Sequence, residues 1–176
     1  TADKAKTLGA TIIIPPFDVK DHGSMTVIQD PTGAVLSLWQ PKTFVGYGKF
    51  SEQAVGVPCW HELMTSNTDV AGGFYSKLLG WTLKNSAIMG FTYNEFQQNG
   101  TSLAGMMAIT KEMGPVPPHW MVYYTVTNCD QSVEKVKSLS GKILMGPQDI
   151  PTIGRFAVIQ DPAGAVCSII QLAQKM

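Results

Sequence analysis

The sequence is poor in charge, and this scarcity excludes several classes of protein. Charged residues make up 15% of the 176 residues, and 13 basic side chains balance 13 acidic ones. A protein that binds nucleic acid needs a basic excess, so no nucleic-acid partner is expected. No apolar run approaches the roughly 18 residues of a membrane helix, and no signal-like segment opens the chain. These absences predict a cytoplasmic protein without a membrane partner.

Paired cysteines and the common catalytic loops are also missing. Cys59, Cys129 and Cys167 form no CxxC pair, and each lies in or beside an apolar run, which is typical of buried reduced thiols. The motifs GxSxG, GxxxxGK[ST] and GxGxxG are absent. This argues against a hydrolase nucleophile elbow and against a nucleotide or dinucleotide loop.

The most informative feature that is present is a long-period internal repeat. Residues 8–40 align without a gap with residues 139–171, at an offset of 131, and 15 of the 33 positions are identical. The identical positions include Pro16/Pro147, Asp18/Asp149 and the block VIQDPxGAV. The chain therefore contains two copies of one supersecondary unit.

Each copy is predicted to consist of three strands. Three apolar runs are separated first by a loop rich in Pro, Gly and Asp, and then by the tetrapeptide Asp-Pro-x-Gly at residues 30–33 and 161–164. Asp, Pro and Gly at these positions favour a type I turn, so the second and third runs should form a hairpin.

Helices are predicted between the strands. Asn67 or Thr68 can cap a helix that ends at Gly80, and a second helix is expected over Asp130–Leu139. The resulting order is β-α-β-β-β twice. We therefore predict an α+β fold with these parts: residues 1–40, a partial βββ half-module; 41–56, a linker; 57–113, a βαβββ module; 114–176, a second βαβββ module.

The tandem pattern, together with the segments CWHELMT, FYSKLLGW, AGMM, PHWMVYYTV and GRFAVIQDPAGA, resembles the vicinal oxygen chelate superfamily. This superfamily includes glyoxalase I, extradiol dioxygenases, fosfomycin-modifying enzymes and bleomycin-resistance proteins. The resemblance implies paired modules whose curled sheets form a cleft for a metal or a small ligand.

The resemblance also implies where a divalent metal would be bound, namely by His, Gln or Glu from the first and last strand of each module. The matching positions here are Trp60, the Leu103–Met107 stretch, Met121 and Ser168, and none of them offers a usual ligand for such a metal. A slipped site using Glu62 and His119 would supply only two ligands. No metal and no other cofactor is expected.

The expected cleft is instead apolar, with a few polar groups. Glu62 is a candidate general base, and Arg155, the only arginine, is a candidate partner of Glu62 or of an anionic ligand group. The ligand-binding candidates are Trp60, Glu62, Met64, Met107, His119, Met121, Tyr123, Arg155, Ser168 and Ile170.

Three functional interpretations remain open at this point. The first is a metal-free protein of the bleomycin-resistance kind that holds an apolar or aromatic small molecule. The second is a metal-dependent lyase or dioxygenase, and the third is a truncated product without activity. The repeat offset places the counterpart of Val57 ahead of residue 1, so an N-terminally truncated first domain is expected. A homodimer in which residues 1–40 pack against a partner would complete the half-module.

Overall fold

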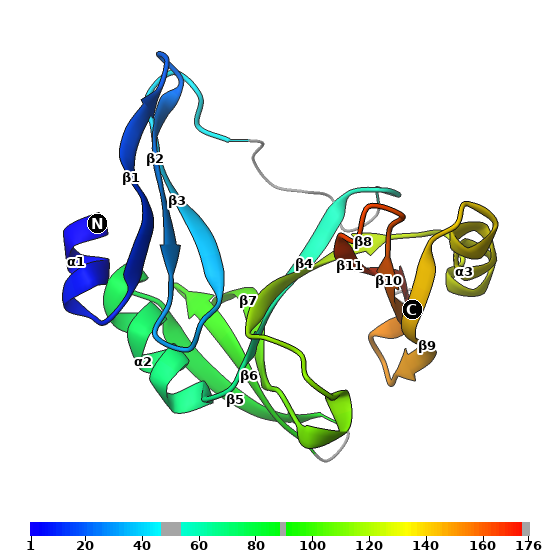
Figure 1. Cartoon of the computed structure of the whole chain (residues 1–176). Coiled ribbons are helices and arrows are strands. Elements are labelled where there is room, and N and C mark those ends of the chain that lie inside the picture. The colour runs from blue at the N-terminus through cyan, green and yellow to red at the C-terminus, as the bar shows by residue number, and fades with distance from the viewer. Residues whose placement is uncertain (47–53, 89–90, 174–176) are drawn as a thin grey trace. The chain divides into compact units, whose positions relative to one another are not determined.

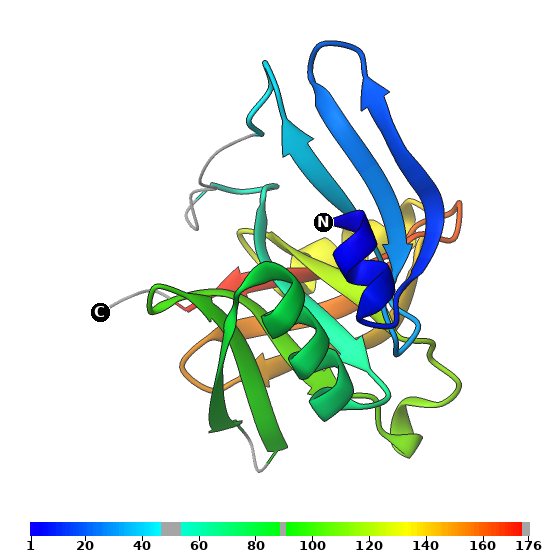
Figure 2. The same ribbon diagram turned by 90° about the vertical axis from the view of Figure 1, so that its left-hand side faces the viewer.

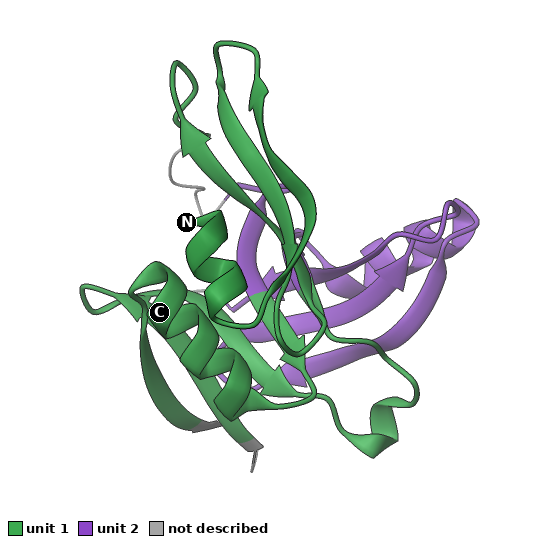
Figure 3. Cartoon of the chain, turned by 60° about the vertical axis from the view of Figure 1, so that its left-hand side comes forward, with its two compact units in different colours: residues 1–48, 62–120 green, residues 49–61, 121–176 purple. Residues whose placement is uncertain are grey.

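The structure is a computed structural model that describes residues 1–46, 54–88 and 91–173. It divides into two compact units, coloured in Figure 3: unit 1 contains residues 1–48 and 62–120, and unit 2 contains residues 49–61 and 121–176. No helix among the described residues is both long enough and apolar enough to cross a membrane. Part of the predicted linker, residues 47–53, lies outside the described residues.

Unit 1 begins with the half-module. Helix α1 (Ala2–Thr7) precedes strands β1 (Thr11–Val19), β2 (Gly23–Gln29) and β3 (Val35–Pro41), which form an antiparallel sheet in the order β1-β2-β3 (Figure 1). At the predicted turn, one carboxylate oxygen of Asp30 accepts hydrogen bonds from the backbone N–H groups of Thr32, Gly33 and Ala34 at 2.7, 2.9 and 3.1 Å. The aspartate thus fixes the turn, as the sequence predicts.

The rest of unit 1 is the first βαβββ module. Strand β4 (Pro58–Thr65) starts in unit 2 and ends in unit 1. It is followed by α2 (Thr68–Leu79), β5 (Thr82–Ile88), β6 (Phe91–Gln98), β7 (Thr101–Ala108) and the 3-10 turn η1 (Lys111–Met113). These strands lie in the order β5-β6-β7-β4, with β4 and β7 parallel.

Helix α2 begins and ends where its local sequence predicts. The Asn67 side chain accepts from the backbone N–H groups of Asp69 and Val70, and Gly80 closes the helix in the left-handed conformation at φ 75°. The helix buries Phe74, Tyr75 and Leu78.

The half-module packs against this module within the same chain. One core cluster joins Ala5, Ile28 and Ala34 of the half-module to residues of α2 and its sheet, including Leu63 and Phe74. Helix α1 lies beside α2 (Figure 2), and Lys4 Nζ donates to the Leu78 carbonyl oxygen at 3.4 Å. This face of the half-module is therefore covered without a partner chain.

Unit 2 contains the second module. It consists of β8 (His119–Thr125), which starts in unit 1, α3 (Cys129–Ser138), β9 (Lys142–Ile150), β10 (Gly154–Gln160) and β11 (Val166–Leu172). The strand order is β8-β11-β10-β9; β11 is parallel to β8 and the other pairs are antiparallel. Helix α3 covers one face through Cys129, Val133, Ala157 and Ile169. The predicted α+β fold with a curled mixed sheet is confirmed.

Candidate functional site

The candidate site in unit 2 is the sheet face opposite α3, which we call the ligand face. Its centre is a cluster of the buried side chains of Met121, Tyr123 and Ile170. The side chains that pack around this centre are half-buried: Cys59, Trp60, Phe156, Val158 and Leu172. The face is therefore apolar and rich in aromatic and sulfur-containing groups, which suits an adaptable surface for an apolar ligand.

Strand register places Ser168 in the middle of this face. Ser168 lies opposite Tyr123 on β8 and opposite Val158 on β10, so the three side chains project from the same side of the sheet. Ile170 follows two residues later and lies opposite Phe156. The Tyr123 and Phe156 rings lie 6.1 Å apart between centroids, tilted by 44°.

The Ser168 hydroxyl is the main polar anomaly of unit 2. Its side chain is fully buried, and in the described part of the chain its Oγ is the only buried side-chain nitrogen or oxygen without a hydrogen-bond partner. A buried hydroxyl in this state costs about 1–3 kcal/mol. A buried hydroxyl without a partner calls for an explanation, and an ordered water or a ligand atom that completes the hydrogen bond are two of them.

The first residues of β4 connect to the same face. Val57 O accepts from Thr125 N at 3.1 Å, and the Cys59 thiol contacts the Tyr123 carbonyl oxygen at 3.5 Å. These contacts hold the start of β4 beside β8 and set Trp60 against the cluster.

The other two cysteines of unit 2 are Cys129 and Cys167. Burial raises the pKa of both thiols, so both stay protonated at neutral pH.

Besides His119, three of the candidates lie in unit 1, on the face of its sheet opposite α2. Glu62 is 6% exposed and lies opposite Gly105, while Met64 lies opposite Met107. Met64 is buried and Met107 is half-buried. Glu62 is thus a buried carboxylate that lies opposite a residue without a side chain.

Arg155 does not lie on the ligand face. It is two residues from Ala157, which packs under α3, so strand alternation directs Arg155 to the α3 side. Its Nε and Nη2 donate to the two Asp130 oxygens at 2.9 and 3.0 Å, and Nη1 donates to Asp149 at 3.0 Å. The expectation that Arg155 meets Glu62 or a ligand is wrong, because its donors are engaged by two carboxylates.

His119 opens β8 two residues before Met121, so strand alternation directs both side chains to the same side of the strand. Its Nδ1 lies 2.8 Å from the Pro117 carbonyl oxygen, a short-range contact that orients the ring. This geometry supports a local structural role for His119.

The residues present do not fit the divalent metal site that the resemblance to the superfamily implies. Ser168 and Met121 stand at two positions where the resemblance implies ligands, and the described part of the chain contains no group of three or more His, Cys, Asp or Glu side chains able to hold a metal ion. A catalytic metal centre normally takes three protein ligands. The described residues therefore fall short of the ligand set that such a centre needs.

Sequence reasoning missed four residues of the ligand face, namely Cys59, Phe156, Val158 and Leu172. The alternation of Phe156, Val158 and Gln160 along one predicted strand was a usable signal. It also missed a buried polar link in unit 1. The Tyr75 hydroxyl donates to Asp30 at 2.8 Å and accepts from Trp120 Nε1 at 3.0 Å.

Comparison with known proteins identifies the family. The sequence profile of the Glyoxalase/Bleomycin resistance protein/Dioxygenase superfamily matches residues 60–169. The chain belongs to this superfamily. At the level of fold, it is similar to the Mn(II)-bound glyoxalase from Novosphingobium aromaticivorans, with a TM-score of 0.60, 16% identity, and coverage of 97% of this chain and 57% of that chain. It is equally similar to the 2,3-dioxygenase LapB from Pseudomonas sp. KL28, with a TM-score of 0.60, 16% identity, and coverage of 98% and 66%.

Curated relatives match over nearly the whole chain. CFP32 of Mycobacterium tuberculosis, provisionally named a glyoxylase, is 36% identical over 172 residues, which are 97% of this chain and 64% of the relative. The anthracycline biosynthesis protein DauV of Streptomyces sp. is 33% identical over 177 residues, covering 97% of this chain and 61% of the relative. The chain thus spans less than two thirds of the length of these relatives.

Proposed function

We propose that this protein binds an apolar or aromatic small molecule on the ligand face of unit 2, without a metal ion. The observation that carries the proposal is the fully buried Ser168 hydroxyl, unpaired among apolar and aromatic side chains. An apolar surface with a single unsatisfied polar group is the usual composition of a small-molecule site.

The chemistry of the face narrows the class of ligand. A planar aromatic ring can stack against the half-buried Trp60 and Phe156, while the Ser168 hydroxyl donates to a carbonyl or phenolate oxygen of the ligand. The relatives named for anthracycline biosynthesis make a polycyclic aromatic quinone a rational first probe. The three free thiols are consistent with a reducing cytoplasmic location, which is part of the same proposal.

A specific observation favours a second function for the same chain. Glu62 is a buried carboxylate on the sheet face of unit 1 that α2 leaves uncovered. A carboxylate in such a position can remove a proton from a bound substrate, so a lyase that needs no metal is the alternative. This alternative requires turnover, whereas the binding proposal does not.

The test is calorimetric titration of the metal-stripped protein with a panel of aromatic quinones and hydroxyquinones. We expect binding to survive chelator treatment and to weaken by about two- to tenfold in Ser168→Ala, since one hydrogen bond contributes about 0.5–1.5 kcal/mol. The matched control is Ser37→Ala, because Ser37 is the exposed repeat counterpart of Ser168 and its removal should leave affinity unchanged.

Two results would contradict the proposal. One is equal affinity of the Ser168→Ala variant and the unmodified protein for every ligand that binds. The other is binding that appears only after a divalent metal is restored. Native mass spectrometry of protein purified without chelators adds an independent readout of bound metal and of any ligand carried through purification.

A further inference from the structure

The ligand face of unit 2 is bounded on its outer side by strand β9, which brings a polar side chain to it. Gln148 lies opposite Phe156 of β10, so both side chains project from the same side of the sheet. The next residue, Asp149, lies opposite Arg155 and accepts from its Nη1 at 3.0 Å on the α3 side. Strand alternation therefore directs Gln148 to the ligand face.

Gln148 ends one of two neighbouring rows of side chains that cross this face. Each row takes one residue from β11, β10 and β9 in turn: Ser168, Val158 and Met145 in the first row, and Ile170, Phe156 and Gln148 in the second. Ser168 and Gln148 are the polar members, and they occupy diagonally opposite corners of the patch. The other four side chains are apolar and lie between or beside the two polar corners.

The register of the strands sets the distance between these corners. Neighbouring strands are spaced by about 4.8 Å, and two residues along a strand cover about 6.7 Å. Ser168 and Gln148 are two strands apart and one such step apart, so their Cα atoms are separated by about 12 Å. A flat ligand that is bonded to both therefore lies over Phe156 and Val158 and carries polar atoms at both of its ends.

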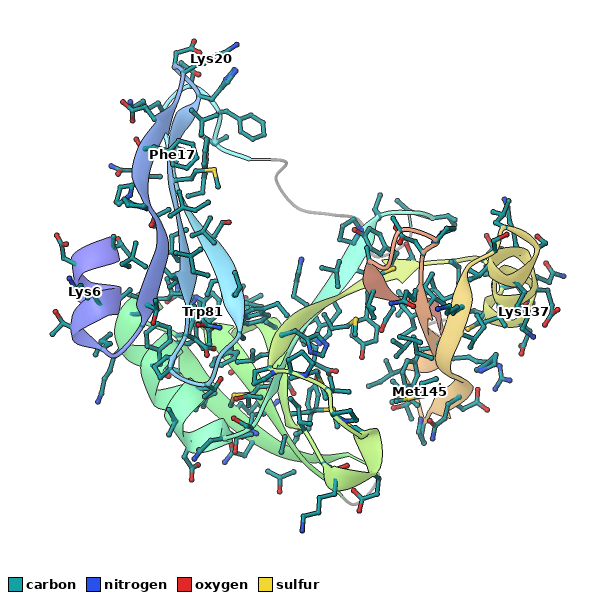
Figure 4. The ribbon with its side chains drawn as sticks, viewed as in Figure 1. Lys6, Phe17, Lys20, Trp81, Lys137 and Met145 are labelled. Carbon is teal, nitrogen blue, oxygen red and sulfur yellow. The ribbon has the colours of Figure 1, made fainter. Side chains whose placement is uncertain are left out.

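The half-module provides a comparison for this position. At the offset of 131, the counterpart of Gln148 is Phe17 of β1, which lies opposite Met25 just as Gln148 lies opposite Phe156. Figure 4 shows Phe17 and Met145 on the corresponding outer strands, β1 and β9. Because the strand register is the same in the two copies, the change from phenylalanine to glutamine alters the chemistry of one position and not its place in the sheet.

The Gln148 amide is available to a ligand. Its side chain is exposed and has no hydrogen-bond partner among the described residues. The two other glutamines of this sheet are engaged by backbone groups: Gln160 donates to the Gly164 carbonyl oxygen at 3.1 Å, and Gln171 accepts from Cys129 N at 3.0 Å. A free amide at the margin of an apolar face is the kind of polar group that orients a ligand in a small-molecule site.

We propose, as a refinement that rests on the proposed function, that Gln148 is a specificity-determining residue of the unit 2 site. The ligand is an elongated, planar aromatic molecule with an oxygen at each end: Ser168 bonds one oxygen, Phe156 and Val158 contact the rings, and Gln148 bonds the other oxygen. The amide donates through its N–H groups and accepts through its carbonyl oxygen, so it pairs with a hydroxyl or a carbonyl group. A ligand with one polar end binds at Ser168 and leaves the Gln148 amide to water.

The test compares two ligands that differ at one end. 2,6-Dihydroxyanthraquinone carries a hydroxyl at both ends of a planar ring system, whereas 2-hydroxyanthraquinone carries a hydroxyl at one end. Both are titrated calorimetrically into the metal-stripped unmodified protein and into Gln148→Ala. The matched control is Gln131→Ala, because Gln131 is an exposed glutamine of α3, which covers the other face of the sheet.

We expect Gln148→Ala to lower the preference for the dihydroxy ligand over the monohydroxy ligand by about two- to tenfold, the effect of one lost hydrogen bond. The affinity for the monohydroxy ligand should not change. Gln148→Phe, which introduces the residue type of Phe17, should lower the preference in the same way and keeps a good strand former at this position. Gln131→Ala should leave both affinities as they are in the unmodified protein.

Three outcomes would overturn the proposal. The first is an equal preference in the unmodified protein and in both Gln148 variants, and the second is an equal loss of affinity for both ligands, which indicates a structural role. The third is the failure of both ligands to bind the unmodified protein. The proposed function is decided separately, by the wider ligand panel and by Ser168→Ala: if Ser168→Ala weakens both ligands while the Gln148 variants keep the preference, only the role of Gln148 is refuted.

Discussion

Replacing Tyr75 with Phe tests what holds the half-module to its neighbouring module. The Tyr75 side chain is fully buried, and its hydroxyl donates to Asp30 at 2.8 Å and accepts from Trp120 Nε1 at 3.0 Å. The ring itself contacts Phe74 and Phe96 edge-on, at centroid distances of 5.0 and 5.5 Å. Phenylalanine keeps these ring contacts and removes only the hydroxyl oxygen that joins the two polar partners.

The magnitude follows from what each partner loses. Asp30 is 4% exposed, and its second oxygen already accepts three backbone hydrogen bonds. A hydrogen bond to a charged group contributes about 1.5–3 kcal/mol. Trp120 is half-buried, so water can partly replace the acceptor that its indole N–H loses. We expect Tyr75→Phe to lower the free energy of unfolding by about 2–4 kcal/mol, a large share of a typical total of about 5–15 kcal/mol.

Urea unfolding followed by far-ultraviolet circular dichroism measures this change. The matched control is Tyr124→Phe, which removes the hydroxyl of a half-buried tyrosine in unit 2 and should change the stability by less than about 0.5 kcal/mol. The reasoning is refuted if the two variants unfold at the same midpoint with equal slopes. In a double-mutant cycle, Tyr75→Phe should cost markedly less in an Asp30→Ala background, because the acceptor is already absent.

Further predictions concern the same side chains and the ligand site. Burial, and the nearby Asp30 carboxylate after it, raise the pKa of Tyr75 above its ordinary value near 10. The stability that the neutral Tyr75 hydroxyl contributes is therefore complete below about pH 10 and is lost at higher pH. In urea unfolding at alkaline pH, the free energy of unfolding of the unmodified protein should fall faster than that of Tyr75→Phe, by up to about 1.4 kcal/mol per pH unit. Ser168→Ala should stabilise the ligand-free protein by about 0.5–2 kcal/mol in the same assay, because it removes an unpaired buried hydroxyl; a loss of stability would show that the hydroxyl is satisfied. Glu62→Gln should lower a steady-state turnover rate by about a hundredfold or more if Glu62 is a general base, and should leave ligand affinity in unit 2 unchanged. Arg155→Lys should leave ligand affinity unchanged in calorimetry, since the carboxylate partners of Arg155 lie on the α3 side. A large loss of affinity would show that Arg155 contacts the ligand.

The parts of the fold that depend on local chemistry could be predicted from the sequence. Asn67 and Gly80 bound their helix because a cap and a left-handed residue act within one turn of backbone. The turn at Asp30 is equally local. Strand alternation likewise puts Glu62 and Met64 on one face of β4, opposite to Leu63, which belongs to the core cluster with Phe74 of α2. Each of these inferences needs only the residues within a few positions of the feature.

The failures have a different physical origin. Strand alternation puts Arg155 on the same face as Ala157, but it cannot tell which face of the strand lies under α3. That assignment depends on contacts between elements far apart in sequence. The hydrogen bond between Tyr75 and Asp30 joins residues 45 positions apart, and neither residue carries a local signal of the other.

The two copies of the repeat show how one sequence pattern serves two purposes. Asp30 and Asp161 fix the same turn, but Asp30 is buried against Tyr75 whereas Asp161 is exposed. The copies differ at the second position after the aspartate: the Thr65 hydroxyl donates to Thr32 at 2.9 Å, and alanine at position 163 could not accept such a bond. The threonine is therefore found in the turn that packs against β4, and the alanine is found in the turn that remains exposed to solvent.

The same comparison extends to the serines and explains why the site is assigned to unit 2. Ser37 and Ser168 occupy equivalent positions of the repeat, yet Ser37 is exposed and Ser168 is fully buried. The difference arises from β8, which brings Tyr123 to the strand that carries Ser168 and has no described counterpart beside β3.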